Sequence, residues 1–137
     1  MLFSRSQPAD LDFEPRPLDT LLRSAAAADP DHPALVFFDN SITYGELDRT
    51  VDRLTGAFQE RGIAKGDRVS VFMPNCPQAV IAYEAIWRAG AIAVPSNPLY
   101  TASEFGHQAR DAGSKAVVVL SLMYPRVAEV LDNTSLE

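Results

Sequence analysis

Apolar residues recur at helical spacing in the middle of the chain, with charged residues on the other faces. Thr43 and Glu46 precede this run with the spacing of a capping box, in which each side chain satisfies a free backbone donor of the other residue. Gly62 is expected to end the helix. The apolar face is formed by Leu47, Val51, Leu54 and Phe58.

From Arg68 onward one plan repeats: a short apolar strand, a turn and an amphipathic helix. Strands are predicted at residues 68–72, 91–95 and 116–120, so that their starts lie 23 and 25 residues apart. This spacing leaves room for one crossover helix, which favours parallel pairing with right-handed connections. The crossover helices are predicted at residues 76–89 and 102–112, the second behind a capping box of Thr101 and Glu104.

The two ends of the chain are less regular. Five of the ten prolines fall within the first 33 residues, which predicts an extended leader over residues 1–17. A helix at residues 19–28 and a hairpin follow, with strands at 34–38 and 41–43 around a turn at Asp39 and Asn40. A last helix is predicted at 123–132. Residues 132–137 form a polar tail where the next strand would be expected, so we expect that the strand–helix series is cut there.

Composition excludes several classes of function. The 137 residues carry a net charge of −6 and no cluster of basic residues, so nucleic acid is not an expected partner. Cys76 is the only cysteine, so no internal disulfide is possible. No signal-peptide core and no transmembrane segment is predicted. We therefore expect a cytoplasmic protein, with peripheral membrane association left open.

Candidate site residues follow the predicted strands, because open parallel sheets bind ligands beyond the carboxyl ends of their strands. Asn75 follows the first of these strands, and Asn97 and Tyr100 follow the second. Pro98 holds Asn97 extended, so its amide could reach a ligand; the alternative is that Asn97 only forms a turn. We take all three as candidates for a substrate cleft.

No complete catalytic or metal site is evident. Neither G-x-G-x-x-G nor G-x-x-x-x-G-K-[ST] occurs, and the two histidines, His32 and His107, are far apart in the sequence and belong to no ligand cluster. Cys76 is expected to be a small residue at a helix start and Trp87 a core anchor. Five carboxylates are expected on solvated faces, namely those of Asp48, Asp52, Glu60, Glu84 and Asp111.

Two other doubly wound folds occur at this chain length, the receiver domain and the flavodoxin-like fold. A receiver domain requires an acidic cluster after its strands, and a flavodoxin-like protein requires a hydroxyl- and glycine-rich phosphate loop. The residues that follow the predicted strands offer neither.

Four stretches resemble the N-terminal part of adenylate-forming enzymes, in particular bacterial long-chain fatty-acid-CoA ligases. The resemblance extends from about residue 17 to residue 131. The stretches are residues 42–47 (ITYGEL), 62–69 (GIAKGDRV), 73–75 (MPN) and 87–101 (WRAGAIAVPSNPLYT), the last of which leads into Glu104, His107 and Gln108. The resemblance implies an α/β fold with a mainly parallel sheet and flanking helices, an incomplete N-terminal portion of the large domain. Residues 18–131 would form the partial subdomain.

The resemblance also implies a reaction: ATP and a carboxylic acid form an acyl-adenylate, and coenzyme A then takes the acyl group. The family's phosphate loop and catalytic lysine are not in this sequence, so no catalytic residue can be carried over. ATP, Mg²⁺ and coenzyme A are expected to bind the complete parent enzyme and none of them this chain alone. Its partners would be the remainder of the ligase chain and a fatty acid or other carboxylic acid.

Two hypotheses remain open. The chain is either part of an acyl-CoA ligase that is inactive by itself, or a free-standing α/β binding or interaction module without catalysis. An uncovered apolar sheet face or edge would favour the first, and a cooperatively melting monomer would favour the second.

Overall fold

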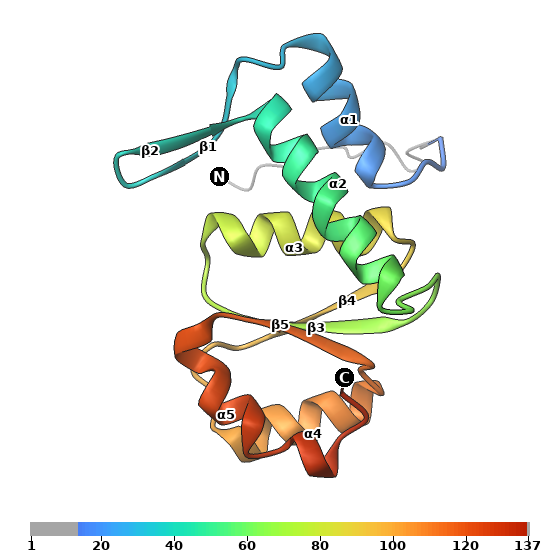
Figure 1. Cartoon of the computed structure of the whole chain (residues 1–137), viewed down its shortest axis with the longest axis vertical. Coiled ribbons are helices and arrows are strands. Elements are labelled where there is room, and N and C mark those ends of the chain that lie inside the picture. The colour runs from blue at the N-terminus through green and yellow to red at the C-terminus, as the bar shows by residue number, and fades with distance from the viewer. Residues whose placement is uncertain (1–13, 137) are drawn as a thin grey trace, which may run out of the picture.

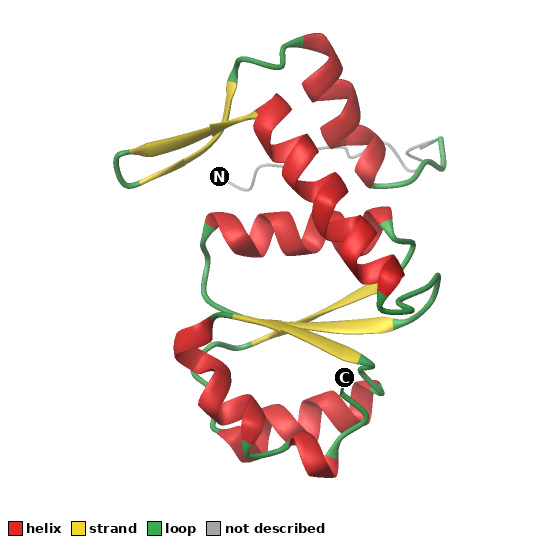
Figure 2. Cartoon of the chain, viewed as in Figure 1, coloured by secondary structure: helices red, strands yellow, loops and turns green. Residues whose placement is uncertain are grey.

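The computed structural model describes residues 14–136. A three-stranded sheet lies between two layers of helices, and a two-stranded hairpin extends away from this body (Figures 1 and 2). The elements are α1 (Asp19–Ala28), β1 (Pro33–Phe37), β2 (Asn40–Thr43), α2 (Tyr44–Glu60), β3 (Arg68–Phe72), α3 (Pro77–Arg88), β4 (Ile92–Ser96), α4 (Ala102–Ala112), β5 (Ala116–Val119) and α5 (Tyr124–Ala128). Two 3₁₀ turns, Ser121–Met123 and Leu131–Asn133, flank α5.

The parallel sheet has the strand order β4-β3-β5. Both pairings are parallel, as the strand spacing predicted, with Arg68 opposite Ile92 and Val69 opposite Ala116. Residues 69–72 of the central strand are buried, because this strand has a neighbour on each side and helices above and below. The sheet is therefore the centre of the structure.

Alternate side chains of the central strand β3 point to opposite faces of the sheet and enter two separate apolar clusters. Val69 and Val71 pack with α1, α2 and α3, whereas Phe72 packs with α4 and α5. The rings of Phe72 and Phe105 are stacked with centroids 4.5 Å apart, and both side chains are fully buried. Each such burial contributes about 1.5–3 kcal/mol, so this pair anchors α4 to the sheet.

Both predicted capping boxes are present. The backbone N–H of Thr43 donates to Glu46 Oε2 at 2.9 Å, and the N–H of Glu46 donates to Thr43 Oγ1 at 3.3 Å. Thr101 and Glu104 repeat this arrangement at the start of α4. Gly62, with a φ of 78°, follows the C-cap of α2, so the predicted end of this helix is also confirmed.

The turn of the hairpin differs by one residue from the prediction. Phe37 pairs with Asn40, so Phe38 and Asp39 form the turn in place of Asp39 and Asn40. Phe38 has a φ of 52°, a left-handed conformation that is uncommon for a residue with a large side chain. The preference of Asp and Asn for such conformations did not set the register; cross-strand pairing did.

The last helix is shorter than expected. In place of one helix over 123–132, α5 has only five residues and a 3₁₀ turn stands on either side. Pro125 lies in the first turn of α5, where its missing N–H costs nothing, so it is compatible with the start of the helix and does not cause its early end at Ala128. Val127 and Val130 are nevertheless buried, so the predicted apolar face joins the cluster around Phe72 and Phe105, called the lower cluster below.

The chain ends are placed as follows. Residues 14–17 are exposed and without regular structure, and the rest of the expected leader lies outside the described residues. In the expected tail, Ser135 Oγ donates to the carbonyl of Ser114 at 2.9 Å, and Leu136 packs on the lower cluster. No helix within residues 14–136 has the length and apolar character needed to cross a bilayer.

Candidate functional site

The carboxyl ends of the parallel strands β3, β4 and β5 lie at the same end of the sheet, where the three candidate residues were expected. Asn75 is exposed before α3 and lines a hollow of about 300 Å³ with Val36, Phe37 and Tyr83. Tyr100 is half-buried and lines a different hollow of about 570 Å³, at α4. Asn97 lines neither hollow. The structure therefore does not bring the three candidates into one pocket.

Asn97 forms a turn. Its Oδ1 accepts a hydrogen bond from the backbone N–H of Leu99 at 3.0 Å, and its carbonyl accepts one from the N–H of Tyr100 at 3.0 Å. These bonds fix the loop that leads from β4 into α4. The turn is one of the two roles considered for Asn97, and a contact between its amide and a ligand stays a prediction.

Two polar atoms at the end of β4 were missed by the sequence reasoning. Ser96 Oγ and Gln108 Oε1 are buried and have no hydrogen-bond partner within the described part of the chain. Gln108 is held in place by its Nε2, which donates to the Pro95 carbonyl at 3.0 Å. Buried polar atoms normally have hydrogen-bond partners. These two atoms could therefore bind a further group at the carboxyl end of β4.

The start of α4 carries a negative charge. The Glu104 carboxylate accepts hydrogen bonds from the backbone N–H and the side-chain hydroxyl of Thr101, both at 2.9 Å. These bonds hold the pKa of Glu104 below its ordinary value. A helix start of this kind is already satisfied and would repel a phosphate.

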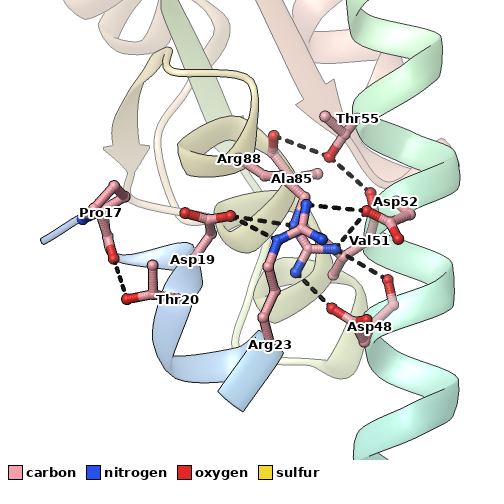
Figure 3. A network of polar contacts seen from close by, with 10 residues as sticks. All are labelled: Pro17, Asp19, Thr20, Arg23, Asp48, Val51, Asp52, Thr55, Ala85 and Arg88. Atoms are coloured by element: carbon pink, nitrogen blue, oxygen red, sulfur yellow. Dashed lines mark hydrogen bonds and ion pairs between the residues drawn. The ribbon is translucent and has the colours of Figure 1, made fainter. Parts of the chain in front are cut away.

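A buried arginine forms the largest polar network of the described residues (Figure 3). Only 3% of the Arg88 side chain is exposed, and its guanidinium contacts carboxylates of α1 and α2. Arg88 Nη2 lies 2.6 Å from Asp48 Oδ1, Nη1 lies 2.8 Å from Asp52 Oδ1, and Nε lies 3.7 Å from Asp19 Oδ2. The network joins three helices, which gives it a structural role.

Several expectations for single residues were wrong. The side chain of Asp48 is only 23% exposed, whereas that of Asp52 is 51% exposed, as expected, although both carboxylates bind Arg88. Their separation of four residues places them on one side of α2, a signal that could have predicted a common partner. Glu84 is half-buried, and burial raises its pKa. Trp87 is also only half-buried and stacks on Tyr83, while Ile86 is the fully buried anchor of α3.

Potential nucleophiles and metal ligands are dispersed. Cys76 is the N-cap residue of α3, its side chain makes no capping bond, and it lines the hollow beside Asn75. His107 is exposed on α4 and lines the other hollow. Within residues 14–136 no three His, Cys, Asp or Glu side chains are grouped so that they could hold a metal ion.

Comparison with known proteins identifies the family of this chain. The family described as AMP-binding enzyme matches residues 22–137. The chain belongs to the AMP-binding enzyme family. It is 37% identical over 123 residues to the long-chain-fatty-acid-CoA ligase of Bacillus subtilis, which covers 90% of this chain and 22% of that ligase. The ligase of the same name from Salmonella typhimurium is 36% identical over 137 residues, covering 95% and 24% respectively.

Solved structures of AMP-binding enzymes have the same fold. The long-chain-fatty-acid-CoA ligase FadD1 from Archaeoglobus fulgidus matches with a TM-score of 0.80 at 28% identity, over 93% of this chain and 27% of that one. The N-terminal domain of FACL13 from Mycobacterium tuberculosis matches with a TM-score of 0.78 at 30% identity, over 83% and 30%. The chain thus corresponds to an N-terminal part of these enzymes and spans less than a quarter of the curated relatives' length.

Proposed function

We propose that this chain is the N-terminal scaffold of an acyl-CoA synthetase that activates a fatty acid or another carboxylic acid. In the first half-reaction a carboxylate oxygen attacks the α-phosphorus of ATP, and pyrophosphate leaves. In the second, the sulfur of coenzyme A attacks the carbonyl carbon of the acyl-adenylate, and AMP leaves. Preorganised positive charge and Mg²⁺ serve the first step in such sites, because charge builds up on the phosphates.

The observation that carries this proposal is the 37% identity to the Bacillus subtilis ligase over 90% of the chain. It is supported by residues 87–101, in which a glycine and a helix-capping residue each have a structural role. Gly90, with a φ of 76°, connects α3 to β4, and a side chain there would meet Lys65 Cβ at 3.3 Å. Thr101, at the other end of this stretch, caps α4.

We infer that the described residues do not bind ATP or Mg²⁺ by themselves. The carboxylates of Asp48 and Asp52 are engaged by Arg88, and the Glu104 carboxylate occupies the start of α4 where a phosphate would otherwise be attracted. These groups are used by the fold, so we assign the binding of ATP, Mg²⁺ and coenzyme A to the complete ligase. The proposed contribution of residues 14–136 is to form and support the sheet.

The alternative of a free-standing binding module has less support. A severed half-domain should leave an apolar sheet edge uncovered, and β5 is such an edge: residues 116–119 are all apolar and only half-buried. Large apolar side chains are also exposed on the hairpin, where Val36 and Phe38 are 74% and 85% accessible. Both features favour a scaffold that works as part of a larger domain.

The test uses two proteins. One is the 137-residue chain; the other is the Bacillus subtilis ligase in which residues 22–137 of this chain replace the matching segment. We expect fatty-acid-dependent ATP–pyrophosphate exchange from the folded chimera and none from the chain alone. Exchange by the chain alone, lost on substitution of one of its residues, would refute the scaffold role. A folded chimera without exchange would refute the assignment to an acyl-CoA synthetase.

A further inference from the structure

Two buried oxygens at the carboxyl end of β4 are not explained by the packing of the chain. Ser96 Oγ and Gln108 Oε1 are closed to solvent and have no hydrogen-bond partner within the described residues. Only 6% of Ser96 is exposed, so bulk water does not reach its hydroxyl in this arrangement. A polar atom that is buried in this way has lost its bonds to water and gained none in return, which costs free energy.

The register of the sheet places both oxygens between β4 and α4. Ser96 lies opposite Phe72 in the pairing of β4 with β3, and paired residues of neighbouring strands point to the same face of a sheet. Phe72 stacks on Phe105 of α4, so the Ser96 side chain also points toward α4, on the face of the sheet opposite α3 (Figure 1). Gln108 follows Phe105 by three residues and shares its side of the helix.

The chemistry of the two oxygens defines what can bind them. Gln108 Nε2 donates to the Pro95 carbonyl at 3.0 Å, which fixes the amide and leaves Oε1 as an acceptor beside the Pro95–Ser96 peptide. The Ser96 hydroxyl can donate or accept. Since neither oxygen has a partner, they do not bond to each other directly. A ligand must therefore donate to Gln108 and exchange a second hydrogen bond with Ser96.

Size selects among the possible ligands. A site whose polar atoms are closed to solvent has no open path for a large molecule, whereas a single water molecule fits where two or more polar partners converge. Water also donates and accepts, so it satisfies an acceptor and a hydroxyl together. We propose that one buried water molecule binds between Ser96 Oγ and Gln108 Oε1 and joins the end of β4 to α4.

This water would complete the support of the loop at residues 97–101. The loop already contains the turn at Asn97, and Arg126 Nη1 of α5 donates to the carbonyls of Pro98 and Tyr100 at 3.0 and 3.3 Å. The water adds a connection at the first residue before the loop, through Ser96. The inference goes beyond the proposed function, because it holds whichever reaction the sheet serves.

A crystal structure of the 137-residue chain, at a resolution that shows ordered water, tests the site directly. We expect one water molecule at about 2.6–3.2 Å from both Ser96 Oγ and Gln108 Oε1. A direct hydrogen bond between the two side chains, a protein group in the same position, or well-ordered side chains with no water between them would overturn the proposal.

Amide hydrogen exchange tests whether the two side chains act through one shared ligand. Ser96→Ala and Gln108→Met each remove one partner of the water and should speed exchange at the amides of Leu99 and Tyr100 by at least about threefold, the scale of one hydrogen bond. The double variant should exchange no more than about twofold faster than the faster single variant, because the first change already releases the water. Effects that multiply in the double variant contradict a shared water.

The matched control is Ser103→Ala, the same change at an exposed serine of α4, which should leave exchange at both amides within about twofold of the native chain. If circular dichroism shows that Ser96→Ala does not fold, Ser96→Cys replaces it, because a thiol keeps the size of the side chain but bonds more weakly. It is held to the same threefold change. Native exchange rates in the folded Ser96 variant overturn the proposal.

Discussion

Arg88 and Asp48 lie 40 residues apart in the chain, and their side chains meet at 2.6 Å between Nη2 and Oδ1. A guanidinium this deeply buried requires carboxylate partners, because it remains charged in the interior. Asp52 and Asp19 complete the set, so that one side chain from α3 holds α1 and α2. The ion pairs of Arg88 therefore add to the apolar packing that holds these three helices together.

Replacing Arg88 by Met should destabilise the chain by about 2 kcal/mol. Loss of one partner of a buried ion cluster typically costs about 3–5 kcal/mol, and the lower figure allows for the partial exposure of Asp48 and Asp52. Urea unfolding followed by circular dichroism measures the change.

The matched control is Arg23→Met. Arg23 binds Asp19 and Asp52 as well, but about half of its side chain is exposed, so its loss should cost less than about 1 kcal/mol. Equal costs for the two variants would show that burial of Arg88 is not what makes its ion pairs important.

Glu84 should make stability depend on pH. Burial raises the pKa of this carboxyl above its ordinary value of 4.5; the positive charge of Arg88 acts in the opposite direction, and Asp19 and Asp48 add to the rise. A group whose pKa is raised on folding stabilises the protein below its unfolded pKa and loses that contribution as the pH rises through its folded pKa. Glu84→Gln should therefore gain stability relative to the native chain between pH 4 and pH 7, measured by urea unfolding at each pH.

Glu104 should show the opposite dependence. Its hydrogen bonds to Thr101 lower its pKa, so its contribution is present above the unfolded pKa and is lost as the pH falls through the folded pKa. Glu104→Gln retains a capping-box acceptor and should be less stable than the native chain at pH 7, with the difference closing toward pH 3. The same slope for Glu84→Gln and Glu104→Gln would contradict the assigned environments.

Gly113 should tolerate alanine less well than Gly62 does. Both have positive φ, at 60° and 78°, so each substitution carries the cost of about 1–2 kcal/mol of a left-handed residue. A Cβ on Gly113 would also lie 2.8 Å from Arg68 Nη2, which donates to the Gly113 carbonyl, whereas the space at Gly62 is open. Thermal unfolding should show the larger loss for Gly113→Ala; equal losses would mean that Arg68 moves aside without cost.

Local patterns predicted most of the scaffold. The capping boxes at Thr43 and Thr101 mark two helix starts, and the regular spacing of the apolar strands gives their parallel pairing, because both signals lie within short stretches of sequence. The broken α5 and the turn at Phe38 were not predicted. Each depends on tertiary packing or cross-strand register, which short stretches do not encode.

The polar sites were harder to predict for the same reason. The partners of Arg88 lie on α1 and α2, far from Arg88 in the sequence, so no local pattern around Arg88 predicts them. Ser96 and Gln108 become notable only because folding buries their oxygens without partners. Asn75 and Tyr100 were correctly placed after strands β3 and β4, yet proximity to the same sheet edge did not bring them into one pocket.

The central claim is that this chain serves as the front of an acyl-CoA synthetase, and reading the coding DNA beyond the codon for Glu137 tests it most directly. We predict that the frame continues into a further apolar strand and a glycine-, serine- and threonine-rich loop that ends in lysine. A stop codon directly after Glu137 would contradict the claim, because the chain would then work without the phosphate loop on which the proposed reaction depends.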